Sequence, residues 1–116
     1  MPDNADAPVV FEDWELERTD RTVGVLTTNG RDGYPHAAPV GVRWEDGGLR
    51  FETDSDAAKM RNIEADPRVS ILIYGKPKWG VLITGTAEIL SKGVGSEQSQ
   101  IRVRPERKTS WKRKED

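Results

Sequence analysis

The chain has 116 residues, which suit one domain with a single hydrophobic core. It contains no cysteine and one histidine, so disulfides, thiolate chemistry and most zinc sites are excluded. Hydrophobic residues make up 34% and charged residues 33%, a thin apolar supply that favours help from a cofactor or a second subunit. No run approaches the about 20 apolar residues of a membrane span or resembles a signal peptide, so we expect a cytoplasmic protein.

The formal net charge of −2 hides an uneven distribution. Residues 3–20 carry seven acids against one base, Arg18, whereas residues 102–114 carry seven bases against one acid, Glu106. A basic tail can bind nucleic acid. The charged tail here, residues 107–116, holds one aromatic residue, Trp111, and no recognisable nucleic-acid module. We therefore expect solvated charge and no nucleic-acid partner.

Residues 1–10 are acidic and aperiodic, which predicts a loose N-terminus. Phe11 and Trp14 can anchor the segment that follows, either as one helical turn or as an extended approach. Short apolar and β-branched runs between turn signals then predict six strands. They cover residues 22–28, 36–44, 49–53, 69–74, 81–90 and 101–103. Pro39 cannot donate to a strand ladder and indicates an edge or a bulge. Residues 91–100 are expected to form a loop, and the sixth strand to end at Pro105.

One helix is predicted over residues 55–66, where side-chain oxygens of residues 53–56 can cap its first turn. Ala57, Met60 and Ile63 recur at helical spacing and predict its buried stripe. Lys59 lies one turn into this predicted helix. Free N–H groups, the positive end of the helix dipole and an ammonium group together suit a phosphate. The alternative is that Lys59 is a solvated surface lysine.

These elements predict a mainly β protein of one domain, residues 1–116: a six-stranded antiparallel barrel with one short helix between strands three and four. Barrel closure removes exposed sheet edges. The apolar runs over residues 69–73 and 81–83 offer more two-sided apolar surface than one small barrel can cover, which predicts a homodimer.

Five segments in order resemble the pyridoxamine 5′-phosphate oxidase-like, FMN-binding split-barrel family. They are GYPHAAPV (33–40), GLRFET (48–53), KMRNI (59–63), DPRVS (66–70) and GTAE (85–88). The similarity covers about residues 23–90, with a looser echo in residues 101–106. It implies a split barrel that forms a homodimer, with a flavin or the deazaflavin F-420 in a groove between subunits.

The resemblance also implies the cofactor contacts. Ala37, Ala38, Pro39 and Val40 would run along the isoalloxazine ring. Glu52 and Thr53 would border the phosphate, Lys59 would bind it, and Trp79 and Gly80 would approach the ring from the other side.

The sequence departs from the family pattern at three positions. Ala57 and Ala58 stand where a Ser-Arg phosphate-binding pair is common, and Gly80 replaces a glutamine that often contacts the flavin. The arginine and histidine signature for pyridoxamine phosphate is not identifiable in the tail, so vitamin B6 oxidation is not predicted. The implied function is FMN-dependent oxidoreduction of a small molecule. The alternatives are F-420, whose acidic tail could use Lys76, Lys78 and the arginines of the tail, and a non-enzymatic flavin-binding protein.

No catalytic residue and no metal ligand are predicted, since a flavin performs the redox step itself. His36 titrates near neutrality and could act as a general base, but no carboxylate partner is evident in the sequence, and a polar residue at a strand start is the simpler interpretation. Three tryptophans could stack on a planar ring, with Trp79 the best candidate: Trp44, Trp79 and Trp111. Arg102 and Arg104 alternate with apolar residues and should share one strand face.

Overall fold

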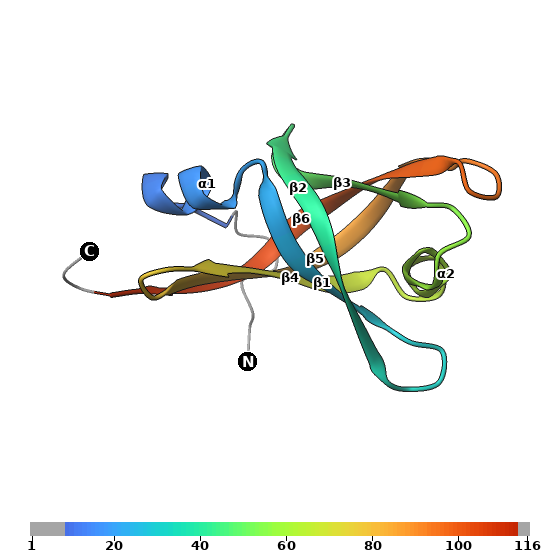
Figure 1. Cartoon of the computed structure of the whole chain (residues 1–116), viewed down its shortest axis with the longest axis horizontal. Coiled ribbons are helices and arrows are strands. Elements are labelled where there is room, and N and C mark those ends of the chain that lie inside the picture. The colour runs from blue at the N-terminus through green and yellow to red at the C-terminus, as the bar shows by residue number, and fades with distance from the viewer. Residues whose placement is uncertain (1–8, 114–116) are drawn as a thin grey trace.

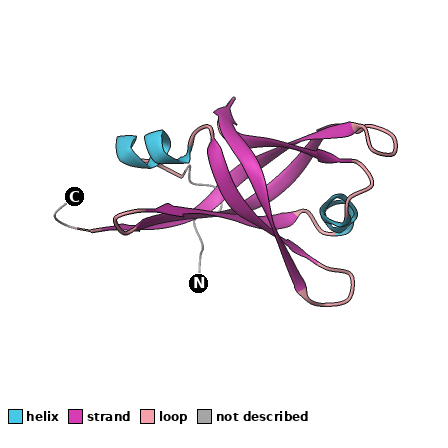
Figure 2. Ribbon diagram, viewed as in Figure 1, coloured by secondary structure: helices cyan, strands magenta, loops and turns pink. Residues whose placement is uncertain are grey.

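The computed structural model describes residues 9–113. Its elements, in chain order, are α1 (Asp13–Thr19), β1 (Thr22–Asn29), β2 (Pro35–Glu45), β3 (Gly48–Asp54), α2 (Ala58–Ala65), β4 (Arg68–Gly75), β5 (Trp79–Ser91) and β6 (Gln98–Lys112). The strands close into an antiparallel barrel in the order β1-β2-β3-β6-β5-β4, with the two helices at opposite ends of its long axis (Figures 1 and 2). The predicted six-stranded barrel is confirmed. Most of the predicted loose N-terminus, residues 1–8, and residues 114–116 of the tail lie outside the described part.

Alternate residues of every strand fill the barrel, as the period-two pattern of the sequence requires. The buried side chains are Leu26, Val40, Val42, Leu49, Phe51, Val69, Ile71, Ile73, Val81, Ile83, Ala87, Ile101 and Val103, together with Met60 and Ile63 of α2. Met60 and Ile63 of the predicted stripe are thus buried, whereas Ala57 precedes the helix and is half-buried.

The start of α2 differs from the prediction. The helix begins at Ala58, not at residue 55, and no side chain caps its first turn. The Ser55 hydroxyl instead donates to the carbonyl oxygen of Glu97 at 2.7 Å and lies 2.5 Å from the Ser99 hydroxyl on β6. The expected cap was wrong because these polar groups are used to hold the start of β6. The helix ends at Ala65, just before Asp66-Pro67, as predicted.

β6 is much longer than predicted. It runs from Gln98 to Lys112 and does not end at Pro105, so residues 107–112 of the expected tail are paired with β5. The register shifts between Thr84 and Gly85, where Gly85 lies opposite Pro105. This bulge accommodates a proline that cannot donate to the ladder. Gly85 permits the close approach, since a Cβ there would lie 2.0 Å from the carbonyl oxygen of Arg104.

A second helix, α1, forms where the sequence left a helical turn or an extended segment open. Glu12 and Glu15 form a capping box at its N-terminus. The Glu15 side chain is fully buried and accepts a hydrogen bond from Lys108 Nζ at 2.8 Å. Part of the basic end of the chain therefore pairs with part of its acidic beginning.

Candidate functional site

The barrel has a short seam between β2 and β3. β2 pairs with β1 from Pro35 to Val42, whereas it pairs with β3 only over Arg43–Glu45. Within the described residues, no strand pairs with the other edge of β2 over residues 35–42. Pro39 lies on this stretch, as its missing N–H indicated. Backbone groups along the open edge are available to a ligand.

The four residues expected along the cofactor ring lie on this stretch of β2. Their side chains alternate: Ala37 and Pro39 are exposed, Ala38 is half-buried and Val40 is buried. Small side chains and an open backbone edge leave room for a flat molecule. This edge could hold a ring by main-chain hydrogen bonds.

α2 packs against β1, the strand next to β2. Asn62 Nδ2 on α2 donates to Thr28 Oγ1 on β1 at 3.0 Å, and both side chains are buried. Thr28 lies opposite His36 at the start of β2. Lys59, half-buried in the first turn, has no ion-pair or hydrogen-bond partner among residues 9–113. An unpaired ammonium beside an uncapped helix start fits a phosphate group. Ala57 and Ala58 add no side-chain donor.

The two β3 residues expected near the phosphate have different surroundings. Glu52 is exposed, and its Oε2 accepts a hydrogen bond from Gln100 Nε2 on β6 at 2.8 Å. Thr53 is 4% exposed and points into the barrel, and its Oγ1 has no partner in the described chain. Within one copy, Thr53 could therefore meet a ligand through its backbone.

Trp79 and Gly80 lie at the other end of the molecule. They begin β5 beside the β4–β5 turn, which is at the end of the barrel opposite α2 (Figure 1). The Trp79 ring faces the Arg18 guanidinium at 5.3 Å and packs against the core. One copy of the chain does not bring these two residues to Lys59.

His36 has a carboxylate partner that the sequence interpretation missed. Its Nε2 lies 3.3 Å from Asp32 Oδ1, across the tip of the β1–β2 hairpin. Asp32 Oδ1 also accepts the backbone N–H of Tyr34 at 3.0 Å. These two hydrogen bonds, with the Tyr34 contact the larger cause, hold the pKa of Asp32 below its ordinary value. Both side chains are exposed, so the pair is a feature of the hairpin surface.

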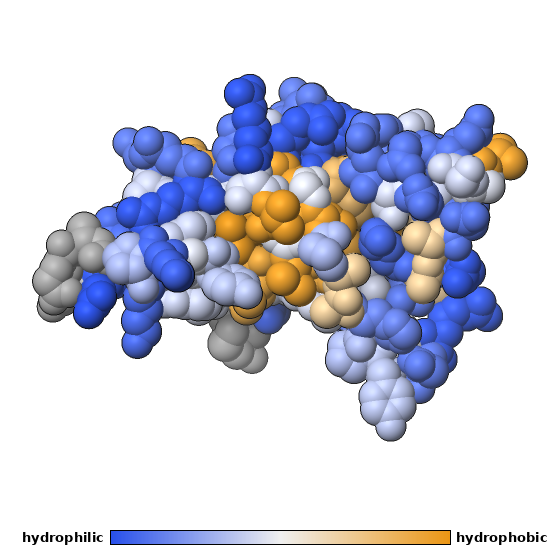
Figure 3. Space-filling view, in the orientation of Figure 1, coloured by the Kyte–Doolittle hydropathy of each residue, from blue (hydrophilic) through white to orange (hydrophobic). Residues whose placement is uncertain are grey.

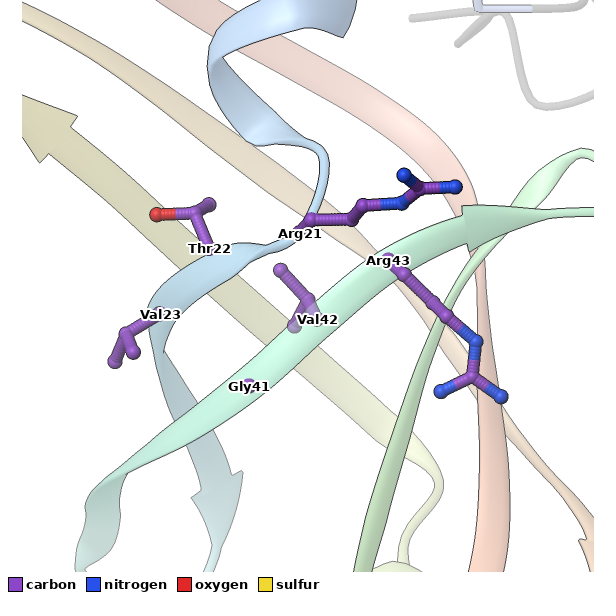
Figure 4. A pocket seen from close by; sticks show the side chains of 6 residues that line it. All are labelled: Arg21, Thr22, Val23, Gly41, Val42 and Arg43. Carbon is purple, nitrogen blue, oxygen red and sulfur yellow. The ribbon is translucent and has the colours of Figure 1, made fainter.

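Two hollows border β1 and β2. One, of about 380 Å³, is lined by Arg21, Thr22, Val23, Gly41, Val42 and Arg43 (Figure 4). Its arginines extend to one side, away from Val23, and could contact an anion. The other hollow, of about 560 Å³, is lined by the β1–β2 hairpin together with residues of β4 and β5. Its floor includes the hydroxyl groups of Thr27, Ser70 and Thr84, which lie opposite one another on β1, β4 and β5.

The outer surface of the barrel is divided into an apolar and a charged part. Pro39, Val25, Leu72 and Leu82 lie opposite one another across β2, β1, β4 and β5 and form one apolar row. We call this the apolar row. Figure 3 shows that hydrophobic side chains gather at the centre of the face drawn there, with hydrophilic side chains around them.

The charged part covers β3 and β6. Arg102 and Arg104 share one strand face, as predicted, and both donate to Glu88 Oε1, at 3.0 and 3.2 Å. These contacts hold the pKa of Glu88 below its ordinary value, with the Arg102 hydrogen bond the largest cause. The two arginines thus already have an acid in their own chain.

Residues 9–113 contain no group of three or more His, Asp or Glu side chains that could hold a metal ion. Neither α1 nor α2 has the length and apolar character needed to cross a bilayer.

Comparison with known proteins identifies the family. The family model described as pyridoxamine 5'-phosphate oxidase matches residues 12–115. A pyridoxine/pyridoxamine 5'-phosphate oxidase from Escherichia fergusonii is 33% identical over an alignment of 94 residues, which covers 75% of this chain and 43% of that protein. The chain thus spans less than half the length of this relative.

Solved structures share the fold. The conserved hypothetical protein Rv2991 from Mycobacterium tuberculosis has a TM-score of 0.75 and 24% identity, over 90% of this chain and 87% of that one. A protein titled F420 reductase has a TM-score of 0.72 and 22% identity, over 86% of this chain and 98% of that one. The family-model match over residues 12–115 shows that the protein belongs to the pyridoxamine 5'-phosphate oxidase family, and the solved structures share its fold.

Proposed function

We propose that the protein is an oxidoreductase that binds FMN between two copies of the chain and acts on a small molecule. The observation that carries this proposal is the half-buried, unpaired Lys59 at an uncapped helix start, in a barrel that leaves one edge of β2 open. When bound, the flavin supplies hydride transfer, and the protein positions and shields it. Lys59 would hold the phosphate, and the backbone of residues 37–40 would hold the polar edge of the ring.

A second copy supplies what one copy lacks. The apolar row is a surface that a homodimer would bury. A two-fold axis that lies in this face, across the long direction of the barrel, exchanges the two ends of the molecule. The β4–β5 end of one copy would then lie over the α2 end of its partner. This arrangement supports a site to which each copy contributes a different end.

Two features favour F-420 as the alternative cofactor. Ala57 and Ala58 provide no side-chain donors for the FMN phosphate. Lys76 and Lys78 are exposed in the β4–β5 turn, where they could pair with an acidic cofactor tail. The fold similarity to a protein titled F420 reductase is compatible with this alternative. The third possibility is a flavin carrier without turnover, and sustained turnover with a reduced nicotinamide donor and an acceptor dye would exclude it.

The decisive experiment is a titration of the Lys59→Ala variant with FMN and riboflavin. A charge-assisted hydrogen bond contributes about 1.5–3 kcal/mol, so FMN affinity should fall about ten- to a hundredfold. Riboflavin has no phosphate and should bind the variant and the wild type about equally.

Arg61→Ala is the control, because Arg61 is exposed and its Nη1 donates to the carbonyl oxygen of Asp56 at 2.7 Å. Its FMN affinity should be nearly unchanged. Parallel titration of the wild type with F-420 decides between the two cofactors. If wild-type protein binds neither, or if Lys59→Ala binds FMN as tightly as wild type, the proposed role of Lys59 is wrong.

A further inference from the structure

One cross-strand row at the β4–β5 end carries two exposed aromatic rings. Tyr74 on β4 lies opposite Gly80 on β5, and Gly80 lies opposite Trp111 on β6. Residues directly opposite one another point to the same face of a sheet. Tyr74 is 65% exposed and Trp111 is 44% exposed. Tyr74 follows Leu72 by two residues, so this row lies next to the apolar row on the same outer face.

Gly80 is what allows Trp111 to lie across β5. A Cβ built on Gly80 would be 2.1 Å from Trp111 Cζ2 and 2.5 Å from Cε2. Such distances are far inside van der Waals contact, so any larger residue would push the indole ring away. The glycine at position 80, where the family often has a glutamine, is therefore what makes room for the Trp111 ring. The space of a side chain at position 80 is filled by an aromatic ring from the neighbouring strand.

The other three tryptophans are already engaged by their own chain. Trp44 meets Phe11 edge-on at 5.0 Å, and its Nε1 donates to Thr19 Oγ1 at 2.7 Å. Trp14 and Trp79 lie on the Arg18 guanidinium at 5.5 and 5.3 Å. No cation or aromatic ring of the described residues stacks on Trp111. Trp111 is therefore the tryptophan whose ring can receive a ligand.

Positive charge borders the aromatic row. Lys76 and Lys78 are exposed in the turn just beyond Tyr74 and Gly80. The end of β6 is tied to this turn, since the backbone N–H of Arg113 donates to the carbonyl oxygen of Lys78 at 3.0 Å. Two aromatic rings with an apolar row on one side and cations on the other suit a flat heteroaromatic ring that carries negative charge.

We infer that Trp111, with Tyr74 beside it, is the surface on which the isoalloxazine ring stacks, in place of Trp79. This inference rests on the proposed function, because the partner copy must supply Lys59 and the open β2 edge. It assigns ring recognition to a residue that lies outside the similar segments of the sequence. It also explains why Gly80 can lack the amide that often contacts the flavin: the indole occupies that space and provides the contact area.

The test uses riboflavin, FMN and F-420 as probes and measures their affinities for Trp111→Ala, Trp111→Phe and Gly80→Ala. Stacking of a base on an aromatic side chain is worth about 1–3 kcal/mol by alanine substitution, so Trp111→Ala should lose about tenfold or more in affinity. The loss should be equal for riboflavin and FMN, unlike that of Lys59→Ala, which should affect FMN alone. Trp111→Phe should retain most of the riboflavin affinity.

Gly80→Ala keeps Trp111 but displaces its ring, so it should lose riboflavin affinity in the same direction. Tyr34→Ala is the matched control, since Tyr34 is an aromatic residue 73% exposed at the β1–β2 hairpin. Urea unfolding of each variant separates binding from folding, and if Trp111→Ala does not fold, Gly80→Ala and Trp111→Phe decide. If wild type binds none of the three probes, the proposed function fails. If wild type binds and both Trp111→Ala and Gly80→Ala retain its riboflavin affinity, the role of Trp111 is overturned while the proposed function stands.

Discussion

Lys108→Met should destabilise the protein strongly, because Lys108 neutralises a buried carboxylate. Lys108 Nζ donates to Glu15 Oε1 at 2.8 Å and to the carbonyl oxygen of Val10 at 2.7 Å. The Glu15 side chain is 0% exposed and that of Lys108 is 20% exposed. Methionine keeps the length of the apolar stem and removes only the ammonium group.

The size of the effect follows from burial. Removal of one partner of a buried ion pair costs about 3–5 kcal/mol, because the other charge stays buried and unpaired. Water can reach the partly exposed Lys108 side, so we expect the lower end, about 3 kcal/mol. For a domain of this size such a loss lowers Tm by about 10 °C. Urea unfolding monitored by tryptophan fluorescence measures it directly.

Arg68→Met is the matched control. Arg68 also pairs with a carboxylate, and its Nε and Nη2 donate to Asp66 at 3.0 and 2.7 Å. The Arg68 side chain is 78% exposed, so the loss of this pair should have a far smaller effect. Equal destabilisation by the two variants would refute the argument that the burial of an ion pair, and not its N–O distance, determines how much it contributes to stability. In the double variant Glu15→Gln/Lys108→Met the buried charge is gone, so part of the stability should return.

Two further predictions concern pH and backbone packing. Burial opposes ionisation of Glu15, but hydrogen bonds from Lys108, Ser110 and the Glu12 N–H outweigh it and hold its pKa below the ordinary value of 4.5. Its contribution to stability is therefore complete above pH 4.5 and is lost as pH falls through the lowered folded-state pKa, so Glu15→Gln should flatten the acid limb of a stability–pH curve. Gly85→Ala should cost about 1–3 kcal/mol in urea unfolding, because its Cβ would collide with a carbonyl oxygen. Gly41→Ala, where a Cβ would meet nothing within 4 Å, should not.

The strands were predictable because their causes are local. Each apolar run alternates or is continuous over the length of a strand, and each is bounded by Gly, Asn, Asp or Pro. The stripe of α2 was predictable for the same reason, since Met60 and Ile63 are one turn apart and both are buried. The stop at Pro67 follows from sterics within one dipeptide.

The sequence predictions failed where residues of a distant strand determine the local structure. Pro105 does not end β6, because Gly85 on β5 offers a bulge, and nothing near Pro105 in the sequence reveals that partner. α2 begins at Ala58 and not at residue 55, because Ser55 forms hydrogen bonds with residues at the start of β6, more than 40 positions away. The contact between Gly80 and Trp111 depends on the same β5–β6 register. The His36–Asp32 pair was missed for a different reason: the two residues are only four positions apart, and it is the fold of the turn between them that brings the side chains together.

Leu72→Asp should dissociate the proposed dimer and abolish FMN binding together. Leu72 is half-buried in the middle of the apolar row and points outward, so a carboxylate there can be hydrated in a single barrel but not in a covered interface. Burial of an unpaired charge costs several kcal/mol per copy, enough to turn a dimer at micromolar concentration into monomers. Lys59 and Trp111 would both remain intact, yet in a monomer they stay at opposite ends of the barrel. Sedimentation and FMN titration of one sample measure both effects, with Val94→Asp, at a position 81% exposed in the β5–β6 loop, as the control. A monomeric Leu72→Asp variant that binds FMN with wild-type affinity would show that one copy holds the whole site.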